Sequence, residues 1–277
     1  MNPVGKALWY VESHFGDLLS LDDVAAVAGV TRHHLTRAFG YATGCSVMRY
    51  VRARRLSEAA KALGAGAPDI LAVALEAGYG SHEAFTRAFV DQFGLTPEAV
   101  RARRDVADLK LMEPIRMDET MLKTLEPPRI ETGRLMLIAG LVERYTDETC
   151  PAMPAQWQRF GDHIGHIPGQ VGNAAYGVIC NSDGEGNVDY VTGVEVQDFS
   201  DLPPEFGRIR VAERRYAVFT HRAHISAIRR TWLTIFGKWL PESGYEIADA
   251  PEFEKYGESF DPHTGLGGVE IWIPIRE

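Results

Sequence analysis

The chain has 277 residues, of which 45% are hydrophobic and 24% are charged, a composition typical of soluble globular protein with about two domains of ordinary size. No stretch approaches the roughly 18 uninterrupted apolar residues of a membrane span, and the N-terminus lacks the basic start and apolar run of a secretory signal. We therefore expect a cytoplasmic protein without a membrane partner. The three cysteines, Cys45, Cys150 and Cys180, lack CxxC spacing, which argues against a disulfide framework or a zinc ribbon.

The formal net charge of -9 is distributed unevenly along the chain. Residues 1–105 contain 12 Lys and Arg against 11 Asp and Glu, whereas the remainder contains 17 against 27. The acidity, which disfavours binding to nucleic acid, therefore belongs to the later part of the chain. A nucleic-acid-binding segment in the first part is compatible with this balance.

One four-residue sequence, TRAF, occurs at Thr36–Phe39 and again at Thr86–Phe89. The residues before the two copies also align, as AGVTRHHL and AGYGSHEAF. Such similarity indicates that one structural unit occurs twice. Because the apolar residues recur at helical spacing, we expect Phe39 and Phe89 to lie in the core of each unit.

The first copy predicts a helix-turn-helix unit. Ser20 and Asp23 form a capping-box pattern at the start of a helix expected over residues 21–28. Gly29 suits the turn that follows, and Thr31 suits the N-cap of the second helix.

The second copy predicts the same order of elements. A helix is expected over residues 69–77, a turn over 78–80, and a helix over 81–92 that is capped by Ser81. Between the copies, residues 46–63 have the pattern of one amphipathic helix. One helix is therefore predicted to join two helix-turn-helix units.

The exposed faces of the two repeated helices carry side chains that can read base edges in the major groove of DNA. Arg can bind guanine with two hydrogen bonds, Glu can accept one from cytosine, and hydroxyl groups can contact bases or phosphates. The predicted DNA-binding residues are Thr31, Arg32, His34, Arg37, Ser81, His82, Glu83, Thr86 and Arg87. For Arg37 and Arg87 the alternative is a structural role, in which each braces the turn or a neighbouring helix.

The second unit reads DILAVALEAGYGSHEAFTRAFVDQFGLTPEAVR, with a glycine-aromatic turn, Phe-x-Arg-x-Phe spacing and a closing Gly-x-Thr-Pro. With these motifs, the region from Val4 to Arg104 resembles the AraC/XylS family of transcriptional regulators. The resemblance implies two helix-turn-helix motifs that contact double-stranded DNA, with RNA polymerase as a further candidate partner. Many relatives have lysines after the second Phe of each motif, where this chain has Gly40-Tyr41 and Val90-Asp91.

The character of the sequence changes after the predicted DNA-binding domain, which covers residues 1–105. Prolines and the absence of a clear apolar period predict a linker over 106–128. Residues 129–277 then predict strands rich in β-branched and aromatic residues: RLMLIAGLVERY, NAAYGVIC, VDYVTGVEV, RYAVFTH and GGVEIWIPI. A helix is expected over 225–240.

This later domain has the pattern of an internal duplication. A strand pair, a helix with a tryptophan and further strands occur over residues 129–198, with Trp157, and again over 207–275, with Trp232. The predicted fold is therefore multidomain: an all-α double helix-turn-helix domain, then an α+β domain with a duplicated strand-helix-strand unit.

The stretches RYAVFTHRAH, TWLTIFGKWLPESGYE, PEFEKYGESFD and VEIWIPI resemble the GyrI-like effector-binding domains that follow AraC-type domains in regulators of Rob-like architecture. The resemblance implies a cleft between the two halves that binds a small molecule, with a protein partner as the alternative ligand. In that family an acidic residue near the start of the last strand can meet a cationic ligand, and the matching position is Glu270.

Alternation along the last strand puts Glu270 and Trp272 on one face. A carboxylate beside aromatic rings would attract a lipophilic cation. The further candidates for the walls of this site are Tyr145, Trp157, Tyr190 and Trp232. The alternatives are that these aromatic residues fill a core and that Glu270 is exposed on an edge strand.

We therefore expect a transcriptional regulator with an effector-binding domain rather than an enzyme. Some GyrI-like domains hydrolyse small electrophilic molecules with a Glu, so a hydrolase or sequestering module attached to the DNA-binding domain is the alternative. No cofactor is expected, because the chain lacks a GxxxxGK[ST] loop. No metal is expected either, because the histidine pairs His163/His166 and His221/His224 lack further ligands at suitable spacing.

Overall fold

The computed structural model describes all residues except 1, 118–119, 121, 147–148, 184–185 and 277. The chain forms two compact units: the first consists of Met1–Leu35 and Cys45–Met117, and the second of Thr36–Gly44 and Asp118–Glu277. Met1 and Glu277, which bound the predicted domains, lie outside the described residues. Within the described part of the chain, every helix is too short or too polar to span a bilayer.

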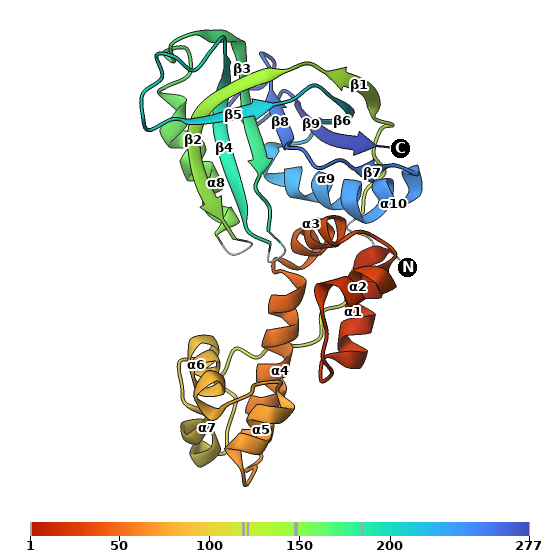
Figure 1. Cartoon of the computed structure of the whole chain (residues 1–277), viewed down its shortest axis with the longest axis vertical. Coiled ribbons are helices and arrows are strands. Elements are labelled where there is room, and N and C mark those ends of the chain that lie inside the picture. Colours follow the sequence, from red (N-terminus) through yellow and green to blue (C-terminus); the bar gives the residue numbers. More distant parts are fainter. Residues whose placement is uncertain (1, 118–119, 121, 147–148, 184–185, 277) are drawn as a thin grey trace. The chain divides into compact units, whose positions relative to one another are not determined.

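The first unit is helical, as predicted (Figure 1). Its elements are α1 (Pro3–His14), α2 (Leu21–Ala28), the first turn of α3 (Arg32–Thr43), α4 (Val47–Gly64), α5 (Ile70–Glu76), α6 (His82–Phe93) and α7 (Pro97–Arg103). The predicted capping box begins α2: Ser20 Oγ accepts a hydrogen bond from the Asp23 N–H, and the Asp23 carboxylate accepts one from the Ser20 N–H. Gly29 ends α2 with a φ of 74°, a left-handed conformation that glycine adopts without strain.

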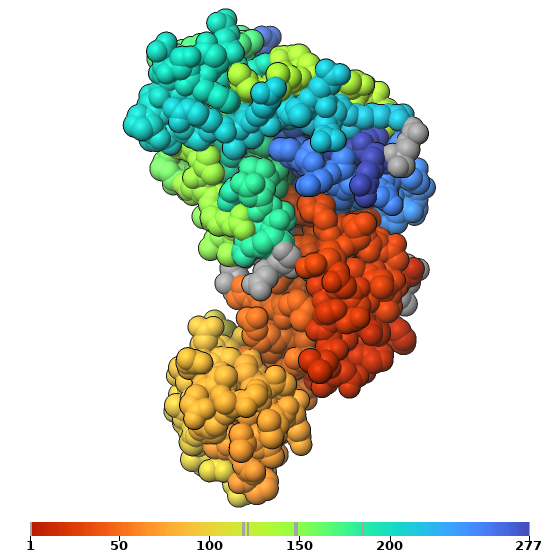
Figure 2. All heavy atoms as spheres, viewed as in Figure 1, coloured from red at the N-terminus to blue at the C-terminus, as the bar shows by residue number. Residues whose placement is uncertain are grey.

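The second helix-turn-helix packs on α4, which joins the two copies as predicted. Ser81 caps α6 by accepting a hydrogen bond from the Ala84 N–H. Phe85 and Phe89 are fully buried and their ring centroids are 5.4 Å apart. They share a hydrophobic core with Leu56 of α4, and the spheres of this yellow-to-orange region form one closely packed lobe (Figure 2).

Residues 106–117, predicted as part of a linker, pack against α4 within the first unit. The Met112 N–H donates to Ser57 Oγ over 2.8 Å, and the Ile115 N–H donates to Tyr50 Oη over 3.0 Å. The first compact unit therefore extends beyond Asp105, the end of the predicted domain, to Met117.

The second unit is built on one antiparallel sheet (Figure 1). Its strands are β1 (Arg129–Gly133), β2 (Met136–Tyr145), β3 (Gln170–Cys180), β4 (Val188–Val196), β5 (Gly207–Val211), β6 (Arg214–His221), β7 (Glu246–Ile247), β8 (Glu252–Tyr256) and β9 (Val269–Arg276). They are ordered β1-β6-β9-β8-β3-β4-β2-β5, and β7 pairs with β9. The five predicted strands correspond to β2, β3, β4, β6 and β9.

The predicted duplication is confirmed by the order of these elements. The first half runs β2, α8 (Met153–Gly161), β3, β4, and the second runs β6, α9 (Ile228–Thr234), β8, β9. Trp157 lies in α8 and Trp232 in α9. The two halves meet where β3 pairs with β8, at the centre of the sheet.

The helix predicted over 225–240 is composite. A 3₁₀ turn (η3, Ile225–Ala227) leads into α9, a π-helical segment (η4, Ile235–Trp239) follows, and α10 (Leu240–Ser243) closes it. Trp232, Ile235 and Phe236 are buried, as their shared face predicts. In the first half, a short 3₁₀ turn (η2, Cys150–Ala152) precedes α8.

Candidate effector pocket and DNA-facing helices

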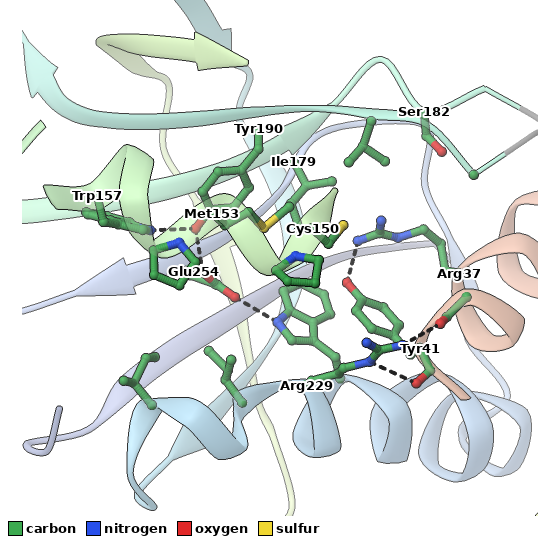
Figure 3. Close-up of a pocket in the computed structure, with 18 of the residues that line it drawn as sticks. Arg37, Tyr41, Cys150, Met153, Trp157, Ile179, Ser182, Tyr190, Arg229 and Glu254 are labelled. Atoms are coloured by element: carbon green, nitrogen blue, oxygen red, sulfur yellow. Dashed lines mark hydrogen bonds between the residues drawn. The ribbon is translucent and has the colours of Figure 1, made fainter. Parts of the chain in front are cut away.

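The second unit contains a cavity of about 440 Å³, a size that suits a drug-sized ligand. Side chains from α3, α8, β3, β4, β8 and α9 surround it (Figure 3). Its aromatic walls are Tyr41, Trp157, Tyr190, Trp232 and Tyr256.

Glu254 of β8 is the only carboxylate residue among the described residues that line this cavity. Its Oε1 accepts a hydrogen bond from Trp232 Nε1 over 2.8 Å. Its Oε2 accepts from Tyr190 Oη over 3.0 Å and from Tyr256 Oη over 2.8 Å. Trp157 Nε1 in turn donates to Tyr190 Oη over 3.0 Å, so neutral donors from both halves of the domain hold one buried carboxylate (Figure 3).

Burial raises the pKa of Glu254 above its ordinary value of 4.5, although the hydrogen bonds from Trp232, Tyr256 and Tyr190 act to lower it. Burial and the neighbouring Glu254 also raise the pKa values of Tyr190 and Tyr256 well above 10.0. The tyrosines therefore remain protonated donors near neutral pH, and Glu254 is the member of this hydrogen-bonded cluster that can carry a negative charge.

A glycine on the neighbouring strand makes room for this arrangement. Gly177 of β3 pairs with Glu254. A Cβ atom at position 177 would lie 2.2 Å from Tyr190 Oη and 2.9 Å from Glu254 Oε2. Only glycine lets the tyrosine hydroxyl reach the carboxylate at this point.

Three of the predicted effector-site residues, Trp157, Tyr190 and Trp232, line the cavity. Tyr145 is buried behind them: its ring packs edge-on against Tyr190 with centroids 6.3 Å apart, and its hydroxyl donates to Glu143. Tyr145 thus supports a wall of the cavity rather than forming one.

Glu270 and Trp272 lie on the opposite face of the sheet, so the expectation that they line the cavity is corrected. The alternation predicted for β9 is confirmed, because both side chains do share a face. That face is the one of Phe253 and Lys255, which pair with Trp272 and Glu270 respectively. Glu254 lies between Phe253 and Lys255 in β8 and therefore faces the other way.

Glu270 has cationic partners on its own face. Arg129 Nη2 lies 2.6 Å from Glu270 Oε1, and Lys255 Nζ lies 3.7 Å from Oε2. Partial burial raises the pKa of Glu270, but hydrogen bonds from Arg129 and Trp272 outweigh it and the net shift is downward. Glu270 is thus a partly exposed carboxylate whose charge is already compensated.

The residues that the sequence interpretation missed are Glu254, Tyr256 and Tyr41. The stretch PEFEKYGESFD contains β8, but its alternating charges resemble a solvent-facing segment rather than a central strand. The available signal was the period itself, since Glu252, Glu254 and Tyr256 fall on one face of a strand. A charged face turned inward is rare in a core, which makes it typical of a site.

Arg37, predicted to contact DNA or to brace a helix, is buried in the second unit. Its side chain is 9% exposed, and its Nη2 lies 2.7 Å from Glu252 Oε2. The same nitrogen donates to Tyr41 Oη over 2.7 Å. Base contact does not fit Arg37, because a buried guanidinium presents no donor to a groove. Its role is structural, but its hydrogen-bond partners are Tyr41 of its own helix and Glu252 of β8, not the turn or a neighbouring helix as predicted.

The remaining predicted residues of α3 differ in exposure. Thr31 Oγ1 accepts a hydrogen bond from the His34 N–H over 3.2 Å, the N-cap role predicted for it. Arg32 is exposed and pairs with Asp22 over 3.3 Å. His34 is buried, which corrects its assignment as a base-contacting side chain.

In α6 the predicted face is more open. Glu83 and Arg87 are exposed. His82 is half-exposed, with its Nε2 3.1 Å from Glu98 Oε1, and the hydroxyl of Thr86 is buried without a hydrogen-bond partner among the described residues. Of the residues of α6 predicted to contact DNA, Glu83 and Arg87 are therefore the exposed ones, and His82 beside them is half-exposed.

Both the earlier and the later part of the chain are similar to known protein domains. Residues 126–276 match the GyrI-like small molecule binding domain, and residues 24–103 match a helix-turn-helix domain. The chain is 29% identical to the transcriptional regulator Rob of Salmonella typhimurium, over 97% of this chain and 96% of that protein. It is also 29% identical to the right origin-binding protein of Escherichia coli, with the same coverage of 97% and 96%.

The helix-turn-helix region has shorter relatives as well. It is 36% identical to the probable transcription factor PqrA of Proteus vulgaris, over 39% of this chain and 89% of that protein. The match to both domain types, in this order and over nearly the whole chain, agrees with a helical region followed by a sheet-based one. The chain therefore belongs to the transcriptional regulators that join an AraC-type helix-turn-helix domain to a GyrI-like small-molecule-binding domain.

Proposed function

We propose that this protein regulates transcription in response to a lipophilic organic cation, which binds in the cavity of the second unit with Glu254 as its counter-charge. The observation that carries this proposal is a buried carboxylate held by three neutral donors on the wall of an aromatic cavity. Glu254 has no cationic hydrogen-bond partner among the described residues, although Arg37 and Arg229 also line the cavity. A cation that reaches Glu254 is therefore attracted to an anion whose charge no hydrogen-bonded cation compensates, and the low local dielectric strengthens that attraction.

The walls favour an aromatic or otherwise apolar cation over a small hydrated one. Tyr41, Trp157 and Trp232 present rings, while Met153 and Ile179 add apolar surface. Rings attract a cation through their quadrupole, and the attraction is larger when the cation has already shed its water. A hydrated metal ion or a simple ammonium would lose more solvation than these walls return.

For the DNA-binding half, we propose that Arg32 at the start of α3 and Glu83 and Arg87 of α6 contact bases. They are predicted residues that are exposed, do not serve as N-caps, and have side chains suited to hydrogen bonds with base edges. Thr31 and Ser81 serve as N-caps in the structure, and their helix N-termini are suited to contact phosphates.

The geometry supports sensing over hydrolysis. A general base needs a lone pair directed at a water molecule. Both oxygens of Glu254 already accept hydrogen bonds from Trp232, Tyr190 and Tyr256, so the carboxylate is poorly placed to remove a proton. Reversible charge recognition uses the same carboxylate without that requirement.

Isothermal titration calorimetry of the full chain with tetraphenylphosphonium tests the proposed ligand class. Glu254→Gln keeps the shape of the side chain but removes its charge, and we expect it to lose at least about tenfold in affinity. Glu270→Gln is the matched control, since it removes the same charge from the opposite face of the sheet. We expect Glu270→Gln to bind like the parent protein.

Equal affinities in all three proteins would contradict the role of Glu254. If Glu270→Gln binds tetraphenylphosphonium more weakly and Glu254→Gln binds it as the parent protein does, the counter-charge is instead Glu270, as predicted from the sequence. Turnover of an electrophilic ester that is lost in Glu254→Gln would favour the hydrolase alternative.

A further inference from the structure

Arg37 occupies a position in the second unit that has the composition of a cation-binding site. Its guanidinium carbon lies 5.0 Å from the ring centroid of Tyr41 and 5.8 Å from those of Trp232 and Phe236. Its Nη2 donates to Glu252 Oε2. Aromatic rings with a carboxylate are the means by which proteins hold organic cations, and here the chain's own guanidinium fills the place.

This cation site adjoins the effector cavity and shares walls with it. Arg37, Tyr41 and Trp232 all line the cavity, and Figure 3 shows the Arg37 side chain directed toward Tyr41 at one end of it. The Trp232 ring stacks with Tyr41, with centroids 5.6 Å apart, while its Nε1 donates to Glu254. One tryptophan therefore belongs both to the surroundings of Arg37 and to those of Glu254.

The fit of Arg37 in this site is incomplete. Its Nε is buried and has no hydrogen-bond partner within the described part of the chain. A buried donor without an acceptor costs free energy that a solvated arginine would not lose. The buried position of Arg37 is therefore less stable than its ion pair with Glu252 alone would make it.

Building on the proposed function, we infer that Arg37 is a resident cation that competes with the effector. An organic cation entering the cavity takes up the aromatic surface of Tyr41 and Trp232 and is repelled by the guanidinium. Its binding therefore loosens Arg37, and with it the segment Thr36–Gly44, from the rest of the second unit.

The competition acts on a helix that also serves DNA recognition. Helix α3 begins at Arg32 in the first unit and continues through Arg37 into the second. Two ligands of one two-state element are coupled reciprocally. If DNA also binds the held and the released segment with different affinity, a cation that favours the released segment changes the affinity of the full chain for DNA, and DNA changes its affinity for the cation by the same factor.

The test is the affinity of the full chain for tetraphenylphosphonium in three variants. Arg37→Ala removes the competitor and is expected to bind the probe about tenfold more tightly than the parent protein. Arg230→Ala is the control: it removes a positive charge from the same helix as Trp232, α9, but Arg230 is exposed and does not line the cavity. It leaves Arg37 in the cation site, so we expect a gain of about twofold at most.

The third variant keeps the result interpretable if Arg37→Ala alone does not fold, because that substitution removes the Arg37 guanidinium from the buried Glu252 carboxylate. Arg37→Ala with Glu252→Gln leaves the net charge near the cavity unchanged. A gain in affinity in the double variant would then come from the vacated aromatic surface. Hydrogen exchange of the peptide covering Thr36–Gly44 should also become faster when the parent protein is saturated with the probe.

The outcomes separate this inference from the proposed function. If the parent protein binds the probe and neither Arg37 variant binds it more tightly, or if Arg230→Ala gains as much, the competition is refuted while the effector site stands. Slower exchange of Thr36–Gly44 on binding would also refute it. If neither the parent protein nor any variant binds the probe, the proposed function fails and the inference fails with it.

Discussion

The two arginines of the repeated TRAF sequence have opposite surroundings. Arg37 is buried against Glu252 and three aromatic rings, whereas Arg87 is exposed on α6. Phe39 and Phe89, by contrast, are both fully buried as predicted. An apolar side chain has one favourable place, the core, but an arginine is stable in water or against a carboxylate. The repeat therefore predicts packing well and the role of its arginine poorly.

Arg87 provides the clearest test of base recognition. Arg87→Ala should weaken binding to a selected DNA site about tenfold or more, and should weaken binding to random DNA much less. Arg87→Lys is the informative control, because lysine restores a phosphate contact but not two hydrogen bonds to one base. Full rescue by lysine, in anisotropy titrations at fixed salt, would assign Arg87 to the DNA backbone instead.

The raised pKa of Glu254 predicts a pH dependence of cation binding. Burial favours the protonated, neutral carboxyl group, so its pKa lies above 4.5 in the free protein. The charged form binds a cation, so affinity for tetraphenylphosphonium should fall as the pH falls through this raised pKa. The probe carries a fixed charge, and the neighbours Trp232, Tyr190 and Tyr256 do not lose protons in that range. If the affinity of Glu254→Gln for tetraphenylphosphonium falls in the same way as the pH is lowered, another group is responsible for the pH dependence.

At the scale of the element, strand β8 explains why the counter-charge was assigned to the wrong strand. In β9 the alternation is plain and apolar, so the sequence predicts both the strand and the common face of Glu270 and Trp272. In β8 two carboxylates face inward, and charges within a short segment favour a surface interpretation. Their stabilisation comes from Trp232, Tyr190 and Arg37, which are distant in the sequence. Only the tertiary structure brings these groups together.

The pairing of β3 with β8 gives a test at the same scale. Gly177→Ala places a Cβ where Tyr190 Oη and Glu254 Oε2 now meet, so the hydroxyl must move away from the carboxylate. We expect a loss of about 1–3 kcal/mol in folding stability and weaker binding of tetraphenylphosphonium. Gly161→Ala in α8 is the control, because a Cβ there meets nothing within 4 Å. Thermal unfolding with a parallel titration would show the difference, and an unaffected Gly177→Ala would mean that the Tyr190 contact is dispensable.

At the scale of the whole molecule, the sequence predicts two kinds of domain in the right order, and it predicts the duplication within the second. It does so because helical and strand periods are local signals. The boundaries of the two compact units nevertheless differ from the predicted boundary, which was a linker over residues 106–128. Thr36–Gly44 belongs with the second unit, and residues 106–117 belong with the first. The assignment of Thr36–Gly44 to the second unit depends on long-range contacts such as the ion pair of Arg37 with Glu252. A local sequence pattern cannot predict such contacts.

We propose that occupancy of the Glu254 cavity alters the affinity of the protein for DNA. The most direct measurement is the affinity of the full chain for a DNA site selected from a random pool, by fluorescence anisotropy with and without saturating tetraphenylphosphonium. We expect a change of about fivefold or more in the parent protein and in Glu270→Gln, and none in Glu254→Gln. An unchanged DNA affinity in a parent protein that binds the probe, or an equal change in Glu254→Gln, would contradict it.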